Sequence, residues 1–373
     1  MKKLKIAIFC ASEFPVPPTP EMKDIYAPLW LTHYITEELV KRGHNVTLVA
    51  GSDSKTAGKL VSGDLPSLAA NKDFSRFYKQ LTEIKKGEFY DKLKTRRAVI
   101  DQYDHLFLSK LYHTVLDDNF NLIYISMVNM AAVAFASVCH IPAVFTIHAP
   151  INPFTELFFE EYKKRYKNLH FMGISKSHIS PAPDIFDAVV YNGVKMDNFI
   201  FNEKPSGNLL IAGRIAKQKG IVEGIEASQM AGEKLDIVGR HTEDDYWHEQ
   251  VKPRLNDRII YKGFLDYEKM GEAYKNAKAL LMPIQWEEPF GLVMTEAMAC
   301  GTPVIAFRRG SVPEIVVDGQ TGFIVDTVKE MAEAVKKIDR IDRKACREHV
   351  EKNFSVKKMA DRYEEEFLKI VEK

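Results

Sequence analysis

The chain has 373 residues, of which 46% are hydrophobic and 28% are charged, a balance that indicates a folded protein with a sizeable core. This length suits two domains better than one. The formal net charge of +1 gives no overall attraction to nucleic acid, so nucleic acid is not expected as a partner. Cys10, Cys139, Cys300 and Cys346 lie far apart without metal-ligand spacing, which predicts unpaired, buried thiols.

The N-terminal apolar run, 4–10, is followed closely by Glu13 and several prolines. It is too short for a signal peptide and predicts a first buried strand. No stretch approaches the roughly 18 consecutive apolar residues that span a bilayer. We therefore expect a cytoplasmic protein.

Short apolar runs alternate with helical patterns, which is typical of parallel sheets covered on both faces. The first series of predicted strands is 4–10, 45–50, 122–126, 143–147, 170–175 and 187–191. The second series is 209–213, 235–239, 258–263, 279–283, 303–307 and 322–325. The polar, irregular stretch between them, 193–208, is interpreted as an interdomain linker. The predicted fold class is α/β, with two tandem Rossmann-like, doubly wound parallel-sheet domains and a ligand site in the cleft between them, at the carboxyl ends of strands.

The segment 71–118 is helical in period, and its part 79–97 is rich in Lys and Arg. Two interpretations stay open for this basic part. It is either a solvated helix face, or an acceptor platform or weak peripheral contact with an anionic membrane at its inner face.

The stretch 286–325 is the most informative. A loop there, Glu287 to Gly291, leads from a strand into a helix that ends near Gly301, so the free N–H groups of that helix suit a phosphate. Glu288 stands in the loop. Glu296 interrupts an otherwise apolar helix and either bonds to backbone in the core or accepts hydrogen bonds from the vicinal hydroxyls of a ribose.

Two further segments place polar side chains just after predicted strands. In 212–220, Arg214 and Lys219 can converge on a diphosphate through charge-assisted hydrogen bonds, although a solvated basic turn is the alternative. His148 follows the strand 143–147, a position that favours a functional over a structural histidine. Adjacent acidic pairs in the chain lack the context of a Mg²⁺ site, so no metal is predicted.

Together these segments resemble the family 4 retaining glycosyltransferases, whose paired-glutamate signature is similar to Glu288 and Glu296 with their surroundings. The resemblance is specific over 209–325 and diffuse before residue 140. It implies the GT-B fold, with an acceptor-side domain of 1–192 plus 354–373 and a nucleotide-sugar domain of 193–353. It also implies a retaining transfer of a hexose from a UDP- or GDP-type sugar to the hydroxyl of a sugar, lipid or small molecule, with no further cofactor.

The resemblance also implies roles for individual residues. Arg214 and Lys219 would hold the leaving diphosphate, Glu288 and His148 would contact the transferred sugar, and Glu296 would contact the ribose. The other donor-contacting positions, mostly through backbone, would be Gly263, Phe264, Pro289, Phe290, Gly291, Leu292 and Val293.

The chain departs from the family in the loop 11–30, which lacks the glycine pair that brings backbone amides close to the donor. Other readings therefore remain open: an epimerase or donor hydrolase of the same fold, or a degenerate module that binds a nucleotide sugar without catalysis. An NAD-dependent oxidoreductase is disfavoured, because no Gly-x-Gly-x-x-Gly turn follows the first strand of either domain.

Overall fold

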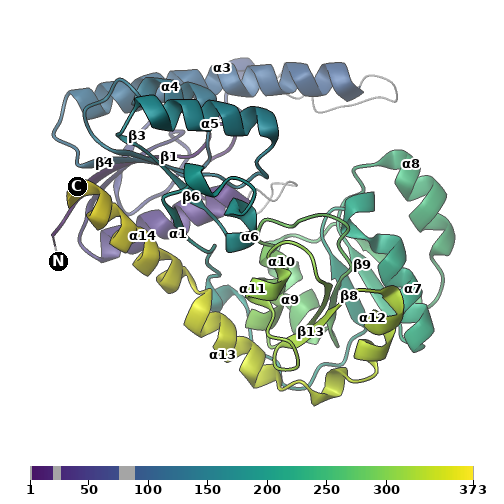
Figure 1. Ribbon diagram of the computed structural model, residues 1–373. Coiled ribbons are helices and arrows are strands. Elements are labelled where there is room, and N and C mark those ends of the chain that lie inside the picture. Colours follow the sequence, from purple (N-terminus) through teal and green to yellow (C-terminus); the bar gives the residue numbers. More distant parts are fainter. Residues whose placement is uncertain (1, 20–26, 75–88, 373) are drawn as a thin grey trace. The chain divides into compact units, whose positions relative to one another are not determined.

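The computed structural model describes residues 2–19, 27–74 and 89–372, and it divides into two compact units. Unit 1 comprises residues 1–173, 182–190 and 360–373, and unit 2 comprises 174–181 and 191–359. Both are α/β units built on an all-parallel sheet (Figure 1). This confirms the predicted fold class.

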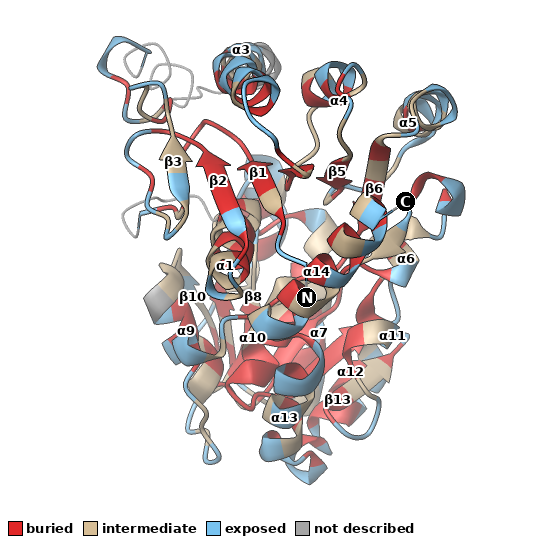
Figure 2. Cartoon of the chain, turned by 90° about the vertical axis from the view of Figure 1, so that its left-hand side faces the viewer, coloured by how far each residue is buried: buried red, intermediate tan, exposed pale blue. Residues whose placement is uncertain are grey.

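Unit 1 has a seven-stranded sheet in the order β3-β2-β1-β4-β5-β6-β7. Its strands are β1 Lys5–Phe9, β2 Asn45–Val49, β3 Lys59–Val61, β4 Leu122–Ile125, β5 Ala143–Thr146, β6 Leu169–Gly173 and β7 Ala188–Val189. Its helices are α1 Ala27–Lys41, α3 Phe89–Leu116, α4 Met130–Ala136, α5 Pro153–Arg165 and most of α14 Val356–Glu372, with a 3₁₀ turn at Pro183–Ile185. Figure 2 shows α3, α4 and α5 side by side over one face of the sheet, and α1 and α14 on the other. The central strands are buried on both sides, as their continuous apolar runs require.

Unit 2 has a six-stranded sheet in the order β10-β9-β8-β11-β12-β13. Its strands are β8 Leu209–Ala212, β9 Leu235–Val238, β10 Ile259–Gly263, β11 Leu280–Met282, β12 Val304–Phe307 and β13 Gly322–Val325. Its helices are α6 Lys176–Ile179, α7 Ile221–Ala231, α8 Asp244–Tyr246, α9 Tyr267–Asn276, α10 Leu292–Ala299, α11 Val312–Ile315, α12 Val328–Val335 and α13 Arg343–Asn353. Short 3₁₀ or π turns lie at Met196–Asn198, Lys217–Lys219, Trp247–Val251, Lys252–Arg254 and Ile338–Arg340. Helix α12 packs against α7, and α10 packs against α9 and α13.

The interpretation of 193–208 as a linker was wrong, because this segment is packed into unit 2. Val194 forms a parallel bridge with Ser355, and Phe199 is buried in the hydrophobic core of the unit. Asn202 N donates to Cys300 O at 3.0 Å. The polar composition of the segment hid the two apolar residues that anchor it.

The unit boundaries also differ from the predicted ones at α6. Glu314 of α11 accepts hydrogen bonds from the backbone N–H groups of Lys176 and Ser177, at 2.8 and 2.7 Å, and from the Tyr191 hydroxyl at 2.8 Å. A single carboxylate thus ties residues 174–181 to unit 2, although they follow a strand of unit 1. The sequence offered no sign of this contact.

The last helix, predicted at 354–373, is α14, and its residues from 360 onward belong to unit 1. Tyr363 and Phe367 are buried there, with ring centroids 5.1 and 5.2 Å from that of Tyr124 on β4. The four cysteines are unpaired and buried, as predicted. Among the described residues, no helix has both the length and the apolar character needed to cross a membrane.

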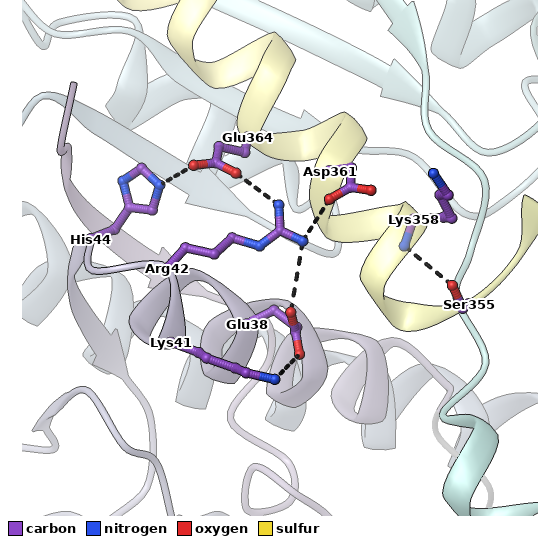
Figure 3. A network of polar contacts seen from close by, with 8 residues as sticks. All are labelled: Glu38, Lys41, Arg42, His44, Ser355, Lys358, Asp361 and Glu364. Atoms are coloured by element: carbon purple, nitrogen blue, oxygen red, sulfur yellow. Dashed lines mark hydrogen bonds and ion pairs between the residues drawn. The ribbon is translucent and has the colours of Figure 1, made fainter. Parts of the chain in front are cut away.

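A polar network in unit 1 joins the end of α1 to α14 (Figure 3). Arg42 donates to Glu364 at 2.7 Å and to Asp361 at 2.8 Å. His44 Nδ1 accepts from Leu4 N, so its Nε2 carries the proton and donates to Glu364 at 2.9 Å. Burial raises the pKa of the Glu364 carboxyl, but the hydrogen bonds from Arg42 and His44 outweigh it, and the net pKa is lowered.

Glu364→Ala should lower the free energy of unfolding by about 2–4 kcal/mol at pH 7, because it leaves Arg42 and His44 without their shared acceptor. A carboxyl with a lowered folded pKa stabilises the protein above its ordinary value of 4.5 and loses that effect as the pH falls. The difference between wild type and variant should therefore shrink below about pH 4.5. Urea denaturation across pH checks this. The matched control is Glu365→Ala, which removes surface ion pairs and should cost at most about 1 kcal/mol; equal losses in the two variants would contradict the role of Glu364.

Candidate active site

The strand order of unit 2 reverses direction between β8 and β11, which are neighbours in the sheet but not in the chain. The loops that follow these two strands leave toward opposite faces, so a crevice is expected at their carboxyl ends, where α/β sheets bind ligands. The two loops, 213–220 and 283–291, contain Arg214, Lys219 and Glu288. The topology alone therefore brings together the predicted diphosphate and sugar residues.

The two loops are in direct contact. Gly220 has a φ of +69° and lies so close to Pro283 that a Cβ there would come within 1.8 Å of the Pro283 carbonyl oxygen. Gln285 N donates to Gln218 O at 2.8 Å. Only glycine fits at position 220, and its absence of a side chain sets the neighbouring Lys219 beside the second loop.

Lys219, Glu288 and Trp286 form a tight cluster. Lys219 Nζ lies 2.5 Å from Glu288 Oε2, and the indole N–H of Trp286 donates to the same oxygen at 3.1 Å. The ammonium also lies 5.1 Å from the centroid of the Trp286 ring, within range of a cation–π interaction. The Lys219 and Glu288 side chains are only 20% and 12% exposed, so their charges are held in place at the crevice.

Arg214 differs from Lys219 in that its side chain is exposed and has no hydrogen-bond or ion-pair partner among the residues that the structure describes. It follows Gly213 at the end of β8. A guanidinium that is already at the carboxyl edge and has no internal partner can bind an anion without first breaking an ion pair.

Helix α10 begins at the same edge and adds backbone donors. Gly291 precedes it with a φ of +78°, and no side chain caps its first turn. The backbone N–H groups of Leu292 and Val293 are therefore open to an anion at the helix N-terminus. Phe290 is 2% exposed and packs in the core, and its carbonyl accepts from the Ser311 hydroxyl at 2.7 Å, so the predicted contact of Phe290 with the donor is not visible in the unliganded protein. Pro289 is buried beside it.

Glu296 lies on α10, one turn beyond this N-terminus. The buried Tyr274 of α9 donates its hydroxyl to Glu296 Oε2 at 3.0 Å. Burial raises the pKa of Glu296 to about 7, and the hydrogen bond from Tyr274 moderates the shift. One interpretation of the sequence was that Glu296 bonds to backbone in the core. Its partner is instead the Tyr274 side chain, which occupies one of the two carboxylate oxygens.

Gly263 and Phe264 lie at the end of β10, two strands away from β8. Gly263 has a φ of +77°, and its carbonyl accepts from Gly239 N at 2.9 Å. The guanidinium of Arg240 lies 4.9 Å from the centroid of the Phe264 ring. With strands about 4.8 Å apart, this pair stands roughly 10 Å from Arg214 along the carboxyl edge, about the span of a nucleotide.

His148 belongs to unit 1, where it follows β5 at the carboxyl edge of that sheet. Its Nε2 lies 2.8 Å from the carbonyl oxygen of Ser126, which follows β4. Since a carbonyl only accepts, Nε2 carries a proton and donates to Ser126.

Three residues of the unit 2 edge were missed by sequence reasoning: Trp286, Tyr274 and Arg240. Trp286 adjoins the glutamate signature, and its indole N–H could have been recognised as a donor in need of an acceptor. Tyr274 and Arg240 come from segments with no motif. Only the folded sheet and the packing of α9 on α10 bring them to the site.

Comparison with known proteins matches residues 197–353 to the family model described as glycosyl transferases group 1. An uncharacterized 41.2 kDa protein in the cps region of Klebsiella pneumoniae is 30% identical over 215 residues, which are 51% of this chain and 55% of that protein. The glycogen synthase of Mycobacterium tuberculosis is 32% identical over 144 residues, 36% of this chain and 34% of the enzyme. The chain thus spans about half or less of the length of these relatives.

The fold extends the likeness to the whole chain. The crystal structure of HepE from Anabaena in complex with UDP-glucose matches with a TM-score of 0.65 over 98% of this chain and all of that chain, at 17% identity. At this identity the match shows a shared fold, that of the GT-B glycosyltransferases. The predicted fold family is confirmed.

Glu296→Gln should stabilise the unliganded protein at pH 8 by about 1–3 kcal/mol and have little effect near pH 4.5. The carboxyl has a raised folded pKa, so its cost to the native state is absent below its ordinary pKa of 4.5 and complete above about 7. Urea denaturation from pH 4.5 to 8 measures the difference. Glu226→Gln, at an exposed position of α7, is the control and should show no such trend. A constant difference across pH would refute the buried-carboxyl account.

Proposed function

We propose that the chain, whose residues 197–353 match the family model of the glycosyl transferases of group 1, is an active, retaining and metal-independent hexosyltransferase. Its donor is a UDP- or GDP-type sugar bound by unit 2, and its acceptor is a hydroxyl compound. The observation that carries the proposal is the ion pair of Lys219 with Glu288, which joins the loops that follow β8 and β11, together with the exposed Arg214 on the first of these loops.

The chemistry of this edge supports a nucleoside diphosphate sugar as the ligand. Arg214 and the uncapped start of α10 offer donors to a diphosphate. Glu288 can accept hydrogen bonds from sugar hydroxyls, and the free oxygen of Glu296 can accept one from a ribose. Gly263 and Phe264, two strands from β8 in the same sheet, are the residues we assign to the base. HepE is solved with UDP-glucose, which makes UDP-glucose the first donor to test.

In the proposed reaction, the bond between the anomeric carbon and the diphosphate oxygen breaks, and the acceptor oxygen bonds to the same carbon on the same face. The leaving phosphate takes the acceptor's proton. Negative charge grows on the diphosphate as the bond breaks, so Arg214, Lys219 and the α10 N–H groups would stabilise the transition state more than the ground state.

Lys219 serves two partners in this scheme. An ammonium has three donors, so it can keep its bond to Glu288 while another N–H turns to the phosphate. Glu288 is thereby oriented by Lys219 and Trp286 for contact with the sugar. The assignment of His148 to the transferred sugar rests on the family resemblance.

A thermal-shift panel of UDP-, GDP- and ADP-sugars tests the donor site. A ligand that binds only the folded state stabilises it by about 2.7 kcal/mol at 100 times its dissociation constant. We expect UDP- or GDP-sugars to raise the melting temperature of the wild type and to lose this effect in Arg214→Ala. Lys217→Ala removes an exposed cation from the same loop and should respond like the wild type. No stabilisation of the wild type at millimolar concentration would contradict the donor site.

Lys219→Ala should lower kcat by roughly 10²–10³, by analogy with the loss of one oxyanion-hole donor. Lys219→Arg keeps the charge and should recover part of the rate. Transfer assays with the donor found above measure this. Proton NMR of the product gives the anomeric configuration, which should match that of the donor, and chelation of metals should leave the rate unchanged. Donor turnover that yields free or epimerised sugar in place of a glycoside would instead identify a hydrolase or an epimerase.

A further inference from the structure

Unit 1 repeats the topological feature that marks the site in unit 2. Its strand order reverses between β1 and β4, so a crevice is expected at the carboxyl ends of these strands. A cavity of about 230 Å³ lies there. It is lined after β1 by Ala11, Glu13 and Phe14 and after β4 by Met127, with Pro28, Leu29, Arg96, Arg97 and Ile100 from α1 and α3.

We infer that this cavity binds an uncharged, apolar portion of the acceptor, so that the preferred acceptor is an amphiphile carrying an alkyl or aryl group. The inference rests on the proposed transferase function and names its acceptor class. His148 places the cavity on the reactive edge of the unit, because its Nε2 bonds to Ser126, the neighbour of Met127.

Two of the charged side chains at the cavity pair with each other. Arg96 donates to Glu13 at 2.7 Å, with side chains only 19% and 6% exposed. Arg97 Nε lies 2.9 Å from Asp101. An anionic ligand at Arg96 would have to displace Glu13 from this mostly buried pair, at a cost that a mostly apolar lining does not offset. Arg97 is more than half exposed, so its pair with Asp101 is weak and does not decide the ligand. The cavity at Arg96 and Glu13 therefore favours an uncharged group.

The backbone around the cavity is likewise engaged. Ser12 donates from its N–H and its hydroxyl to the buried Asp104, at 2.8 and 2.6 Å, and its carbonyl accepts from Leu68 N. Ser12 of the glycine-free loop is thus held by Asp104 of α3, and it has no amide to offer a phosphate. The remaining surface of Leu29, Ile100, Phe14 and Met127 favours apolar contact.

The size of the cavity sets the scale of the group it accepts. An apolar cavity of about 150 Å³ holds a benzene molecule, so about 230 Å³ accommodates a substituted ring or a short alkyl chain. Burying each additional methylene contributes about 0.8 kcal/mol to binding. The affinities for a ligand with an eight-carbon chain and for one with a single methyl group should therefore differ clearly.

Octyl β-glucoside, kept below its micelle concentration, and methyl β-glucoside are the probes. Calorimetric titration should show octyl glucoside binding to the wild type at least tenfold more tightly than methyl glucoside. Ala11→Leu fills the cavity and should abolish this preference. Ala134→Leu, the same substitution at an exposed position of α4, should leave it unchanged. Met127→Trp is a second filling variant should Ala11→Leu fail to fold.

Equal binding of the two glucosides to the wild type, or octyl binding that survives in both filling variants, overturns the inference. The Arg214-dependent donor shift is measured on the same samples. If that shift is present and the octyl preference is absent, the acceptor inference fails while the donor site stands. If the shift is absent, the proposed function fails. In transfer assays, octyl glycosides should be used with at least tenfold higher kcat/KM than methyl glycosides, and Ala11→Leu should remove that ratio.

Discussion

Gly220 and Pro283 approach so closely that no side chain fits between them, and the geometry of the donor edge follows from this contact. It joins the loop after β8 to the loop after β11, the two strands at which the sheet reverses direction. Together with the backbone hydrogen bond from Gln285 to Gln218, it holds the two loops against each other, so the ion pair of Lys219 with Glu288 does not depend on side-chain attraction alone, which is weak near solvent. Backbone contacts therefore position the two loops, and the charged side chains on them remain available to a ligand.

The two cationic side chains at this edge differ in their surroundings. Lys219 is fixed between Glu288 and the Trp286 ring, whereas Arg214 is exposed and has no partner among the described residues. A diphosphate that arrived at such an edge would first meet Arg214 and the open start of α10. Lys219 would then link phosphate and sugar through Glu288. Arg214 and Lys219 would therefore have different roles, although they are only five residues apart in the chain.

Sequence reasoning predicted the parts of the fold that depend on local pattern. The buried strands appeared as apolar runs within a residue or two of their observed bounds, apart from the edge strand β3, whose Lys59–Val61 is only partly buried and shows no such run. The predicted diphosphate and sugar residues of unit 2 converge because strand order, which follows from right-handed crossovers, sets where their loops meet. Contacts such as that of Glu314 with Lys176 and Ser177 could not be foreseen, since they join segments far apart in the chain that share no motif. The basic segment 79–97 lies largely outside the described residues, and its interpretation stays a prediction.

The two units show how one topology produces two kinds of site. Each sheet reverses direction once, and each reversal opens a crevice at the carboxyl ends of the strands. In unit 2 the flanking loops place glycines where backbone must come close and leave a cation and helix N–H groups unpaired, which suits a diphosphate. In unit 1 the corresponding loop has no glycine, its Glu13 is neutralised by Arg96, and Ser12 is bound to Asp104. The loss of the glycine pair therefore changes what this crevice can bind, from a charged group to an apolar one, without changing the fold that forms it.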